Sequence, residues 1–438
     1  MKKIIFISLI MLPLTSALGQ MTMEKIDLIN SLAPLIKEGN IDQAVKNSIK
    51  LGKEAKFMID ASFALGVTLE VSDFDPEWPE KCQSYFRALS KEKNAEIEEI
   101  IWPVISWLDI SEASSGKDKV RMVREYLKQL PPDSLDWKAA DVFSFLILRD
   151  LDKNKLDNRS TYKALFGLLQ THLLVRYRIN PKDNRTRYFL SYSWYYLSQK
   201  NPGKTGEFLC KAAEVSPDPG SDDYFYDMYK LDPILRQKGF RRNYYNYLIG
   251  KGQKDKALPV LEAITVLEPT DSNLNEFKGL FQQVYPDQKE DFLQYWHKAI
   301  SSACENLPAV SFTNDKGEEV VLWNQTGKWT FIDVWGTWCR PCVAEIPELQ
   351  ELYSENLKKP DSPLAIVTWV HDDPALMENF MKEKKYTFPV TLIPRSIEKA
   401  FHINSFPTKL LITPEGKYLK IPFNADWKQY LMNYIGME

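Results

Sequence analysis

Two cysteines separated by two residues constrain this chain more than any other feature. They lie in the run from Trp338 to Cys342, just after an apolar segment from Trp329 to Trp335. The apolar segment predicts a buried strand and the residues after it predict a helix, so the cysteines fall where a strand gives way to a helix. Two thiols at this spacing can close into a disulfide and reopen. The sequence therefore predicts a dithiol redox site in the last third of the chain.

Length and charge limit the classes to which the chain can belong. The chain has 438 residues, too many for one ordinary hydrophobic core, so two or three domains are expected. The formal net charge of -3 gives no reason to propose nucleic acid or an anionic membrane as a partner. Aromatic residues make up 13% of the chain, and we attribute them mainly to packing between helices.

The first residues predict a targeting segment. Two lysines precede an apolar run from Ile4 to Leu14, and Ala17-Leu18-Gly19 offers small residues for cleavage before Gln20. We therefore expect residues 1–19 to be a signal peptide. The mature chain would then be exported, soluble and without a membrane span, in a compartment that permits disulfides. The alternative is that the segment stays uncleaved as a membrane anchor.

Residues 20–303 show helical periodicity almost throughout. Apolar residues recur at intervals of three and four, as at Ile26, Ile29 and Leu32. Turn signals rich in proline and glycine divide the region into short segments. The pattern predicts an N-terminal all-α region of antiparallel helices.

One segment of this region resembles a tetratricopeptide repeat. Ala257 follows the turn residue Gly252 by five positions, and Pro269 follows that alanine by twelve. Small residues at such sites let two helices of a hairpin approach closely, and the proline ends the second helix. Gly39 to Ala44 repeats the first half of the pattern. A helical repeat is one interpretation, and a helical bundle without repeats is the other.

The pattern changes near Asn306, where strands begin to alternate with helices. This alternation indicates a layered α/β domain, which we place at residues 304–438. The predicted strands are Leu307–Phe312, Val320–Leu322, Thr330–Trp335, Leu364–Val370, Leu410–Thr413 and Lys417–Ile421. The predicted helices are Cys342–Leu357, Pro374–Lys384 and Trp427–Ile435.

The spacing of the two cysteines suggests a separate role for each. At a helix N-terminus, Cys339 would cap the helix and Cys342 would lie one turn in. Unpaired backbone N–H groups and the helix dipole favour a thiolate at the first position, and the charge of Arg340 acts in the same direction. Pro341 suits the first turn, because its missing N–H costs little there. We therefore expect Cys339 to be the nucleophile and Cys342 to resolve the mixed disulfide.

Metal and cofactor sites are disfavoured. Zinc needs a second pair of ligands, and the four histidines show no paired spacing. A dinucleotide-binding fingerprint such as G-x-G-x-x-G is missing from the sequence. We therefore expect no metal and no cofactor, only the redox-active disulfide of Cys339 and Cys342.

Residues from about 306 onward resemble the thioredoxin-like domain of the TlpA/ResA class of exported thiol-disulfide oxidoreductases. The resemblance rests on the runs Asp333–Cys342 and Ser405–Thr408, and on Glu345. It implies a C-terminal thioredoxin-like fold and a periplasmic enzyme. Because the family contains mainly reductases, it also implies reduction or isomerisation of protein disulfides. A peroxiredoxin-type site is disfavoured, because such sites carry Thr or Ser where this chain has Gly336.

The resemblance also implies roles for two acids. A buried acid at the position of Asp333 helps to move protons near the second cysteine, and burial within an apolar strand is consistent with a raised pKa. Glu345 matches an acid found near the active site of such proteins. The alternatives are a hydrogen-bonded structural Asp333 and a solvated Glu345 favoured by the helix dipole.

The predicted substrate surface surrounds the cysteines. The resemblance implies a cis Pro407 that faces them, with the backbone of Phe406 placed to pair with an extended substrate peptide. An ordinary trans proline at a strand start is the alternative. Trp335 and Trp338 are expected to serve partly in packing and partly as substrate-facing surface. The full predicted substrate-binding set is Trp338, Arg340, Pro341, Phe406 and Pro407.

Two functions are compatible with the sequence. The first is an oxidoreductase that acts on protein disulfides or thiols and receives electrons from an unidentified donor protein. The second is a helical-repeat adaptor whose thioredoxin-like domain serves mainly to dock a partner. Intact Cys339, Cys342, Asp333 and Pro407 argue against a domain that is purely structural.

Three further cysteines lie singly. Cys210 and Cys304 fall on helical patterns, which predicts that they are buried as small hydrophobic residues. Cys82 follows a proline-rich stretch, which suggests exposure. We assign no disulfide among the three.

Overall fold

The structure is a computed structural model, and its chain forms two compact units. The first comprises residues 1–196 and 226–238, and the second comprises residues 197–225 and 239–438. The described residues are 22–55, 77–131, 140–157, 159–219, 239–286, 291–313, 319–321, 327–359, 361–423 and 425–436. The predicted signal peptide lies outside them. Within these ranges, no helix combines the length and the apolar character needed to cross a membrane.

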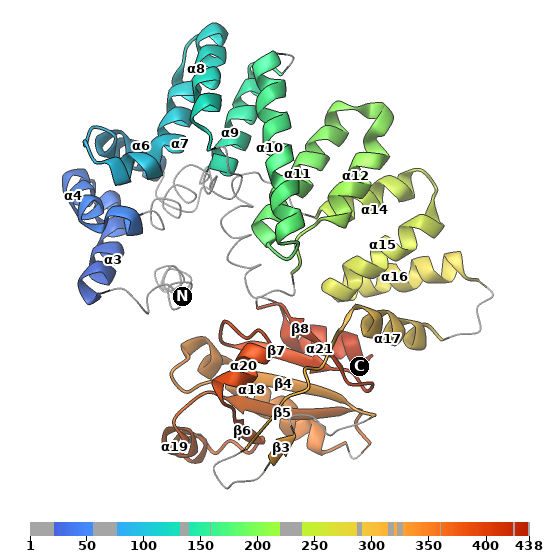
Figure 1. The fold of residues 1–438 in the computed structure, drawn as a ribbon. Helices are drawn as coiled ribbons and strands as arrows, with labels where there is room; N and C mark the ends of the chain where they lie inside the picture. The colour runs from blue at the N-terminus through green and yellow to red at the C-terminus, as the bar shows by residue number, and fades with distance from the viewer. Residues whose placement is uncertain are drawn as a thin grey trace. The chain divides into compact units, whose positions relative to one another are not determined.

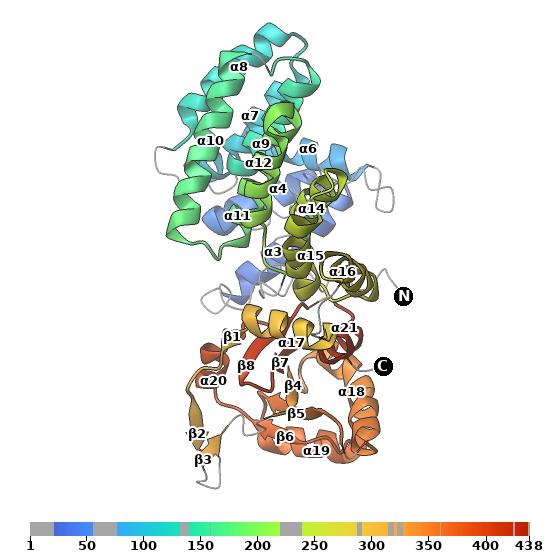
Figure 2. The same cartoon turned by 90° about the vertical axis from the view of Figure 1, so that its right-hand side faces the viewer.

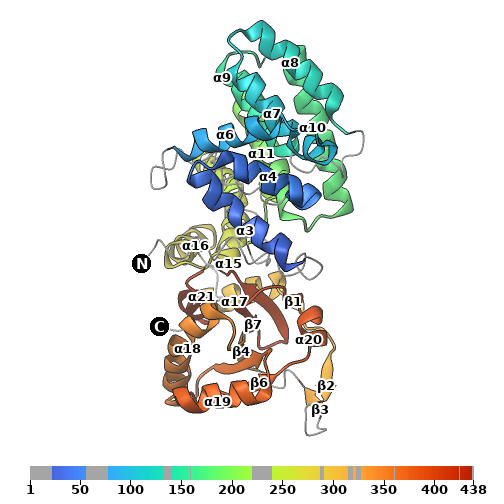
Figure 3. The same cartoon turned by 90° about the vertical axis from the view of Figure 1, so that its left-hand side faces the viewer.

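The described part of the first unit is helical (Figures 1 and 3). Side-chain caps start several of its helices. Thr22 accepts a hydrogen bond from the backbone of Lys25, and Asn94 accepts two from the first turn of its helix. The elements are α3 (Met23–Lys37), α4 (Ile41–Leu51), η2 (Gly52–Glu54), α6 (Trp78–Leu89), α7 (Ala95–Glu112), α8 (Gly116–Gln129), α9 (Ala140–Lys153), α10 (Ser160–Ile179) and α11 (Asn184–Lys200), the last of which continues into the second unit.

The second unit contains further helices, most of which contact the next described helix along the chain, whereas the last of them contacts the helix two before it (Figure 2). Gly252 adopts a positive φ of 69° in a helix-to-helix turn, and Ala257 is fully buried in the helix that follows. Both features agree with closely packed hairpins, whereas a repeat stays a prediction. The helical elements are η4 (Pro202–Lys204), α12 (Thr205–Glu214), α14 (Phe240–Gly250), α15 (Lys254–Leu267), α16 (Asp271–Val284) and α17 (Phe292–Ala303).

Six of the described strands form a mixed sheet in the C-terminal part of the second unit. Their order is β1-β8-β7-β4-β5-β6, with β4, β5 and β6 parallel and the remaining neighbours antiparallel. A separate hairpin pairs β2 (Ser311–Thr313) with β3 (Glu319–Val321). The six strands are β1 (Glu305–Asn306), β4 (Trp329–Trp335), β5 (Leu364–Val370), β6 (Val390–Leu392), β7 (Thr408–Ile412) and β8 (Lys417–Ile421).

Helices cover both faces of this sheet. Apolar residues of β4 pack on one face with α18 (Arg340–Leu357) and α21 (Trp427–Ile435), and on the other with α20 (Arg395–Ala400). Another helix, α19 (Pro374–Lys384), contributes to the α18 face. The arrangement confirms the predicted fold class, an all-α N-terminal region followed by a thioredoxin-like α/β fold.

The predicted strands differ from the observed ones mainly near prolines and at short elements. The strand expected from Leu307 begins only at Ser311, because Pro308 has no N–H to donate to a neighbouring strand. The strand expected at Leu410 begins two residues earlier, at Thr408. Residues 314–318, which connect the two predicted strands, and Leu322, the last residue of the second, lie outside the described residues.

The closing helix α21 packs against the preceding helices as well as the sheet. Trp296 of α17 is buried against the ring of Tyr434, and its Nε1 donates to the carbonyl of Asn433 at 2.8 Å. The hydroxyl of Tyr434 donates to the carbonyl of Val266 at 2.7 Å, in the last turn of α15, where carbonyls lack helical partners. The sheet and helices α15 to α17 therefore share one core.

The substitution Tyr434→Phe tests this shared core, because it removes one buried hydrogen bond and keeps the ring. We expect the free energy of unfolding to fall by about 1–3 kcal/mol, since the Val266 carbonyl loses its partner. Urea denaturation of the full chain measures the change. The matched control is Tyr285→Phe at an exposed position, where we expect a change within about 0.5 kcal/mol. Equal effects of the two substitutions would contradict the prediction.

Candidate active site

The two cysteines of the predicted redox motif form a disulfide at the N-terminus of α18. Cys339 is the N-cap residue, and the backbone N–H of Cys342 donates to its Sγ at 3.3 Å. The Cα atoms of the pair are 5.3 Å apart. Cys339 is 5% exposed and Cys342 is fully buried, so the first cysteine is the one nearer to solvent. This order is the one expected for a nucleophile and its resolving partner.

A short loop carries the chain from β4 to the disulfide and is fixed to the loop that follows β5. The backbone N–H of Thr337 donates to Asp372 at 2.6 Å, and Nε1 of Trp338 donates to the carbonyl of His371 at 2.9 Å. A Cβ at Gly336 would lie 2.5 Å from Nε1 of Trp338, so only glycine fits here without a shift. The loop therefore has little freedom, which holds the cysteines in a defined place.

The two tryptophans that flank the cysteines have different environments. Trp338 is 57% exposed, and its ring meets that of Phe406 edge-on with centroids 5.1 Å apart. Trp335 is fully buried and packs against Phe380. The shared role expected for both is therefore corrected: Trp335 belongs to the core, because it ends a strand that is buried on both faces, and Trp338 faces solvent.

The other predicted substrate-binding residues lie at the same end of the domain. The peptide bond between Phe406 and Pro407 is cis, as the resemblance implied. Arg340 and Pro341 are exposed in the first turn of α18. Phe406 is half-buried beside Trp338 and also approaches the ring of His371. Pro407, in contrast, is buried. The exposed part of the predicted set is therefore Trp338, Arg340 and Pro341, with Phe406 half-buried at their edge.

Asp333 lies beneath α18 because of strand alternation. It shares a face of β4 with Phe331 and Trp335, which pack in the same cluster as both cysteines. Asp333 is 2% exposed, and this burial raises its pKa, while the neighbouring Lys409 opposes the shift. The raised pKa agrees with the sequence prediction for this residue.

Lys409 is the site residue that sequence reasoning missed. It lies opposite Asp333 in the register of β4 and β7, with Nζ 3.4 Å from Oδ1 of Asp333 and 2.5 Å from Oε2 of Glu345. Burial lowers the pKa of Lys409, but the two carboxylates outweigh this effect and the net shift is upward. The available signal was a single lysine among apolar residues of the strand Thr408–Ile412.

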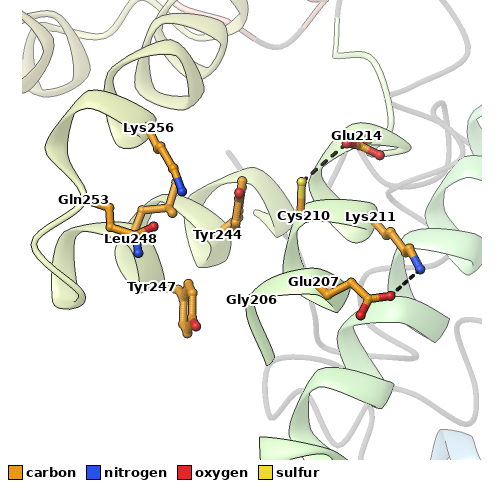
Figure 4. Close-up of a pocket in the computed structure, with 10 residues that line it drawn as sticks. All are labelled: Gly206, Glu207, Cys210, Lys211, Glu214, Tyr244, Tyr247, Leu248, Gln253 and Lys256. Atoms are coloured by element: carbon orange, nitrogen blue, oxygen red, sulfur yellow. Dashed lines mark hydrogen bonds and ion pairs between the residues drawn. The ribbon is translucent and has the colours of Figure 1, made fainter. Parts of the chain in front are cut away.

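A pocket lies between α12 and the hairpin of α14 and α15, and neither cysteine of the disulfide lines it. The pocket has a volume of about 440 Å³. Figure 4 shows Cys210 and Glu214 of α12 on one side and Tyr244 of α14 on the other. Its lining residues are Gly206, Glu207, Cys210, Lys211, Glu214, Tyr244, Tyr247, Leu248, Gln253 and Lys256.

The three single cysteines correct the sequence expectations. Cys82 is fully buried rather than exposed, because it lies on the inner face of α6. Cys210 and Cys304 are half-buried rather than buried. Cys210 lies at the rim of the pocket, where its Sγ contacts Glu214 at 3.4 Å, and Cys304 caps the C-terminus of α17. Periodicity gives the face of a helix but not how far its neighbours cover that face.

Burial of Asp333 predicts a pH-dependent difference between the oxidised wild type and Asp333→Asn. A carboxyl whose pKa is raised by folding stabilises the native state below its unfolded pKa, and this contribution is lost as pH rises through the folded pKa. Asparagine does not titrate. We therefore expect the wild type to lose stability relative to the variant as pH rises, by about 1.4 kcal/mol per pH unit between the two pKa values.

Urea denaturation of both oxidised proteins from pH 4 to pH 8 measures this difference. The control is Asp361→Asn at an exposed position, where we expect the variant and wild type to follow parallel curves. A difference that does not change with pH for Asp333→Asn, or that changes in the opposite direction, would show that the carboxyl is not held in a buried environment.

The C-terminal part of the chain is similar in sequence to known proteins. The AhpC/TSA family model matches residues 304–418. Thiol-disulfide oxidoreductase ResA of Bacillus subtilis (strain 168) is 30% identical over 141 residues, which cover 32% of this chain and 78% of ResA. Sporulation thiol-disulfide oxidoreductase A of the same strain is 29% identical over 134 residues, which cover 28% of this chain and 79% of that protein.

A solved structure gives a similar match in sequence. The crystal structure of StoA from Bacillus subtilis is 29% identical and covers 28% of this chain and 95% of the StoA chain, with a TM-score of 0.24 that is too low to support a structural argument. ResA is at the same level of identity and is matched over most of its length. With the Cys339–Cys342 disulfide at the start of α18, this match shows that the chain is a thiol-disulfide oxidoreductase and belongs to the ResA family.

Proposed function

We propose that this oxidoreductase reduces or isomerises disulfides of exported proteins in the periplasm. The observation that carries the proposal is the disulfide at the N-terminus of α18, whose more exposed cysteine directly follows the solvent-facing Trp338. The predicted signal peptide, residues 1–19, supports export. The disulfide is proposed as the only redox group, so the electrons that restore the dithiol come from a partner protein.

The chemistry proceeds in two exchanges. In the first, the Cys339 thiolate attacks a substrate disulfide, forms a mixed disulfide and releases one substrate thiolate. In the second, Cys342 loses its proton to Asp333, and its sulfur attacks Cys339 and releases the second substrate thiolate. Two electrons pass from the dithiol to the substrate. Asp333 suits the proton-accepting role because it is buried on the same face of the sheet as Cys342.

The surface around the disulfide is suited to an extended peptide. The exposed ring of Trp338 offers apolar contact area, and Phe406 lies two residues before β7, where its backbone can pair with a peptide as an added strand. This binding mode recognises the main chain of the substrate rather than its side chains. The proposed substrates are therefore unfolded or extended segments of proteins that carry disulfides.

Substitution of each cysteine alone tests the proposed roles. Cys342→Ala should accumulate mixed disulfides with substrate proteins, because the resolving thiol is missing. Cys339→Ala should accumulate few, because the nucleophile is missing. Non-reducing electrophoresis of the two variants, incubated with a protein that carries an accessible disulfide, measures the trapped species. Trapping by Cys339→Ala alone would reverse the assigned roles.

The reduction potential tests the proposed direction of electron flow. Equilibration of the mature protein in a series of thiol-disulfide buffers gives this value. A potential near that of thioredoxin, about -270 mV, would support a reductase that needs a donor. A potential near that of DsbA, about -120 mV, would make the protein an oxidant and contradict the proposed direction.

A second candidate function is that of an adaptor, in which the helices bind a partner. The pocket between α12 and the α14–α15 hairpin favours it, because the redox chemistry does not use this concave surface. The double variant Cys339→Ala/Cys342→Ala separates the two functions. If the variant still supports the cellular role of the protein, the adaptor function is the primary one. If the role is lost while the chain stays folded, the oxidoreductase function is primary.

A further inference from the structure

Three charged side chains from three elements meet under the first turns of α18. Lys409 comes from β7, Asp333 from β4 and Glu345 from α18. Residues three apart on a helix lie on one face, so Glu345 is also next to Cys342. Lys409 is buried, and its Nζ lies 5.5 Å from the centre of the Trp427 ring on α21. The group thus lies on the inner side of the disulfide.

The ammonium of Lys409 pairs with two carboxylates in this group, at unequal distances. Nζ of Lys409 donates to Oε2 of Glu345 at 2.5 Å, a short, charge-assisted hydrogen bond. The distance to Oδ1 of Asp333 is 3.4 Å, and that oxygen makes no well-oriented hydrogen bond. The carboxyl of Asp333 is therefore only partly compensated. A partly compensated carboxyl is not held permanently in either its ionised or its protonated form.

We propose that Lys409 is a positioning residue of the redox site: its buried ammonium, divided between Asp333 and Glu345, keeps Asp333 ready to take the proton of Cys342. The inference rests on the proton-accepting role of Asp333 in the proposed function. In that step the S–H bond of Cys342 breaks and an O–H bond forms on Asp333. The sulfur then bonds to Cys339, and the electron pair of the mixed disulfide leaves with the substrate sulfur. Only an ionised Asp333 can accept this proton.

The two charged neighbours of Asp333 should change its pKa in opposite directions. The charged groups that act on it are Lys409, which lowers its pKa, and Glu345, which raises it. The neighbours facing Asp333 and Lys409 across the strand pairs are the uncharged Thr368 of β5 and Ile421 of β8. Lys409→Met should therefore raise the pKa of Asp333, and Glu345→Gln should lower it, because the carboxylate that competes for the ammonium is gone.

Infrared titration of the oxidised protein reads this difference directly. The protonated carboxyl band of Asp333 is identified as the band that disappears in Asp333→Asn. We expect Lys409→Met to move its midpoint upward by about one pH unit or more, and Glu345→Gln to move it downward. Lys409→Arg keeps the charge and should return the midpoint toward wild type. The matched control is Lys428→Met, which removes a surface lysine paired with Glu351 and should leave the midpoint unchanged.

A kinetic measurement tests the consequence for the reaction. The pH profile for resolution of a preformed mixed disulfide should shift its acid limb in the same two directions. A role in stability alone would not shift the acid limb in opposite directions. It would lower the stability and the rate of resolution of both variants together. The inference is overturned if neither variant moves the midpoint, or if both move it in the same direction.

Two features keep the test independent of folding and of the proposed function. If Lys409→Met does not fold, Glu345→Gln still tests the inference, because the side chain of Glu345 is partly exposed and tolerates the change. An unshifted or raised midpoint in Glu345→Gln contradicts the inference. The titration uses oxidised protein without substrate. It therefore reports on Lys409 even if the wild type fails to exchange disulfides, which would contradict the proposed function instead.

Discussion

Burial of β4 along its whole length is the constraint on which the site depends. All seven residues from Trp329 to Trp335 are buried, with α18 and α21 packed on one face and α20 on the other. A strand covered on both faces has a fixed register and a fixed end, because a slip of one residue would exchange its two faces. The fixed end of β4 therefore positions the cysteines at the N-terminus of α18, and the fixed register places Asp333 beneath that helix. The redox pair and its acid are placed by the same core.

The sequence predicted those elements whose pattern is long or strongly periodic. The seven-residue strand β5 and the helices α19 and α21 occupy the predicted bounds, because each has enough residues to show its period. Three short elements were not predicted. The two residues of β1 and the three of β6 show no period of their own, and α20 is a helix of only six residues. Such segments take their structure from pairing with neighbours rather than from local preference.

The candidate site was only partly within reach of the sequence, for a related reason. Cys339, Cys342 and the acids could be named because they lie near one another along the chain or match a motif. Lys409 lies 76 residues after Asp333 by their numbering, and only the antiparallel register of β4 and β7 brings the two together. A sequence shows that a charge interrupts an apolar strand. It does not show which strand lies beside it, and so it cannot name the partner that makes the charge tolerable.

The contacts of α21 also bear on the order in which the protein can fold during synthesis. Trp296 and Asn433 are separated by 137 positions, and Tyr434 reaches back 168 positions to Val266. The helices α15 to α17 leave the ribosome long before α21 exists. Until then, the apolar surface that Tyr434 will cover has no partner, and it is open to chaperones or to aggregation. Completion of the redox domain and protection of its helical neighbours are therefore one event.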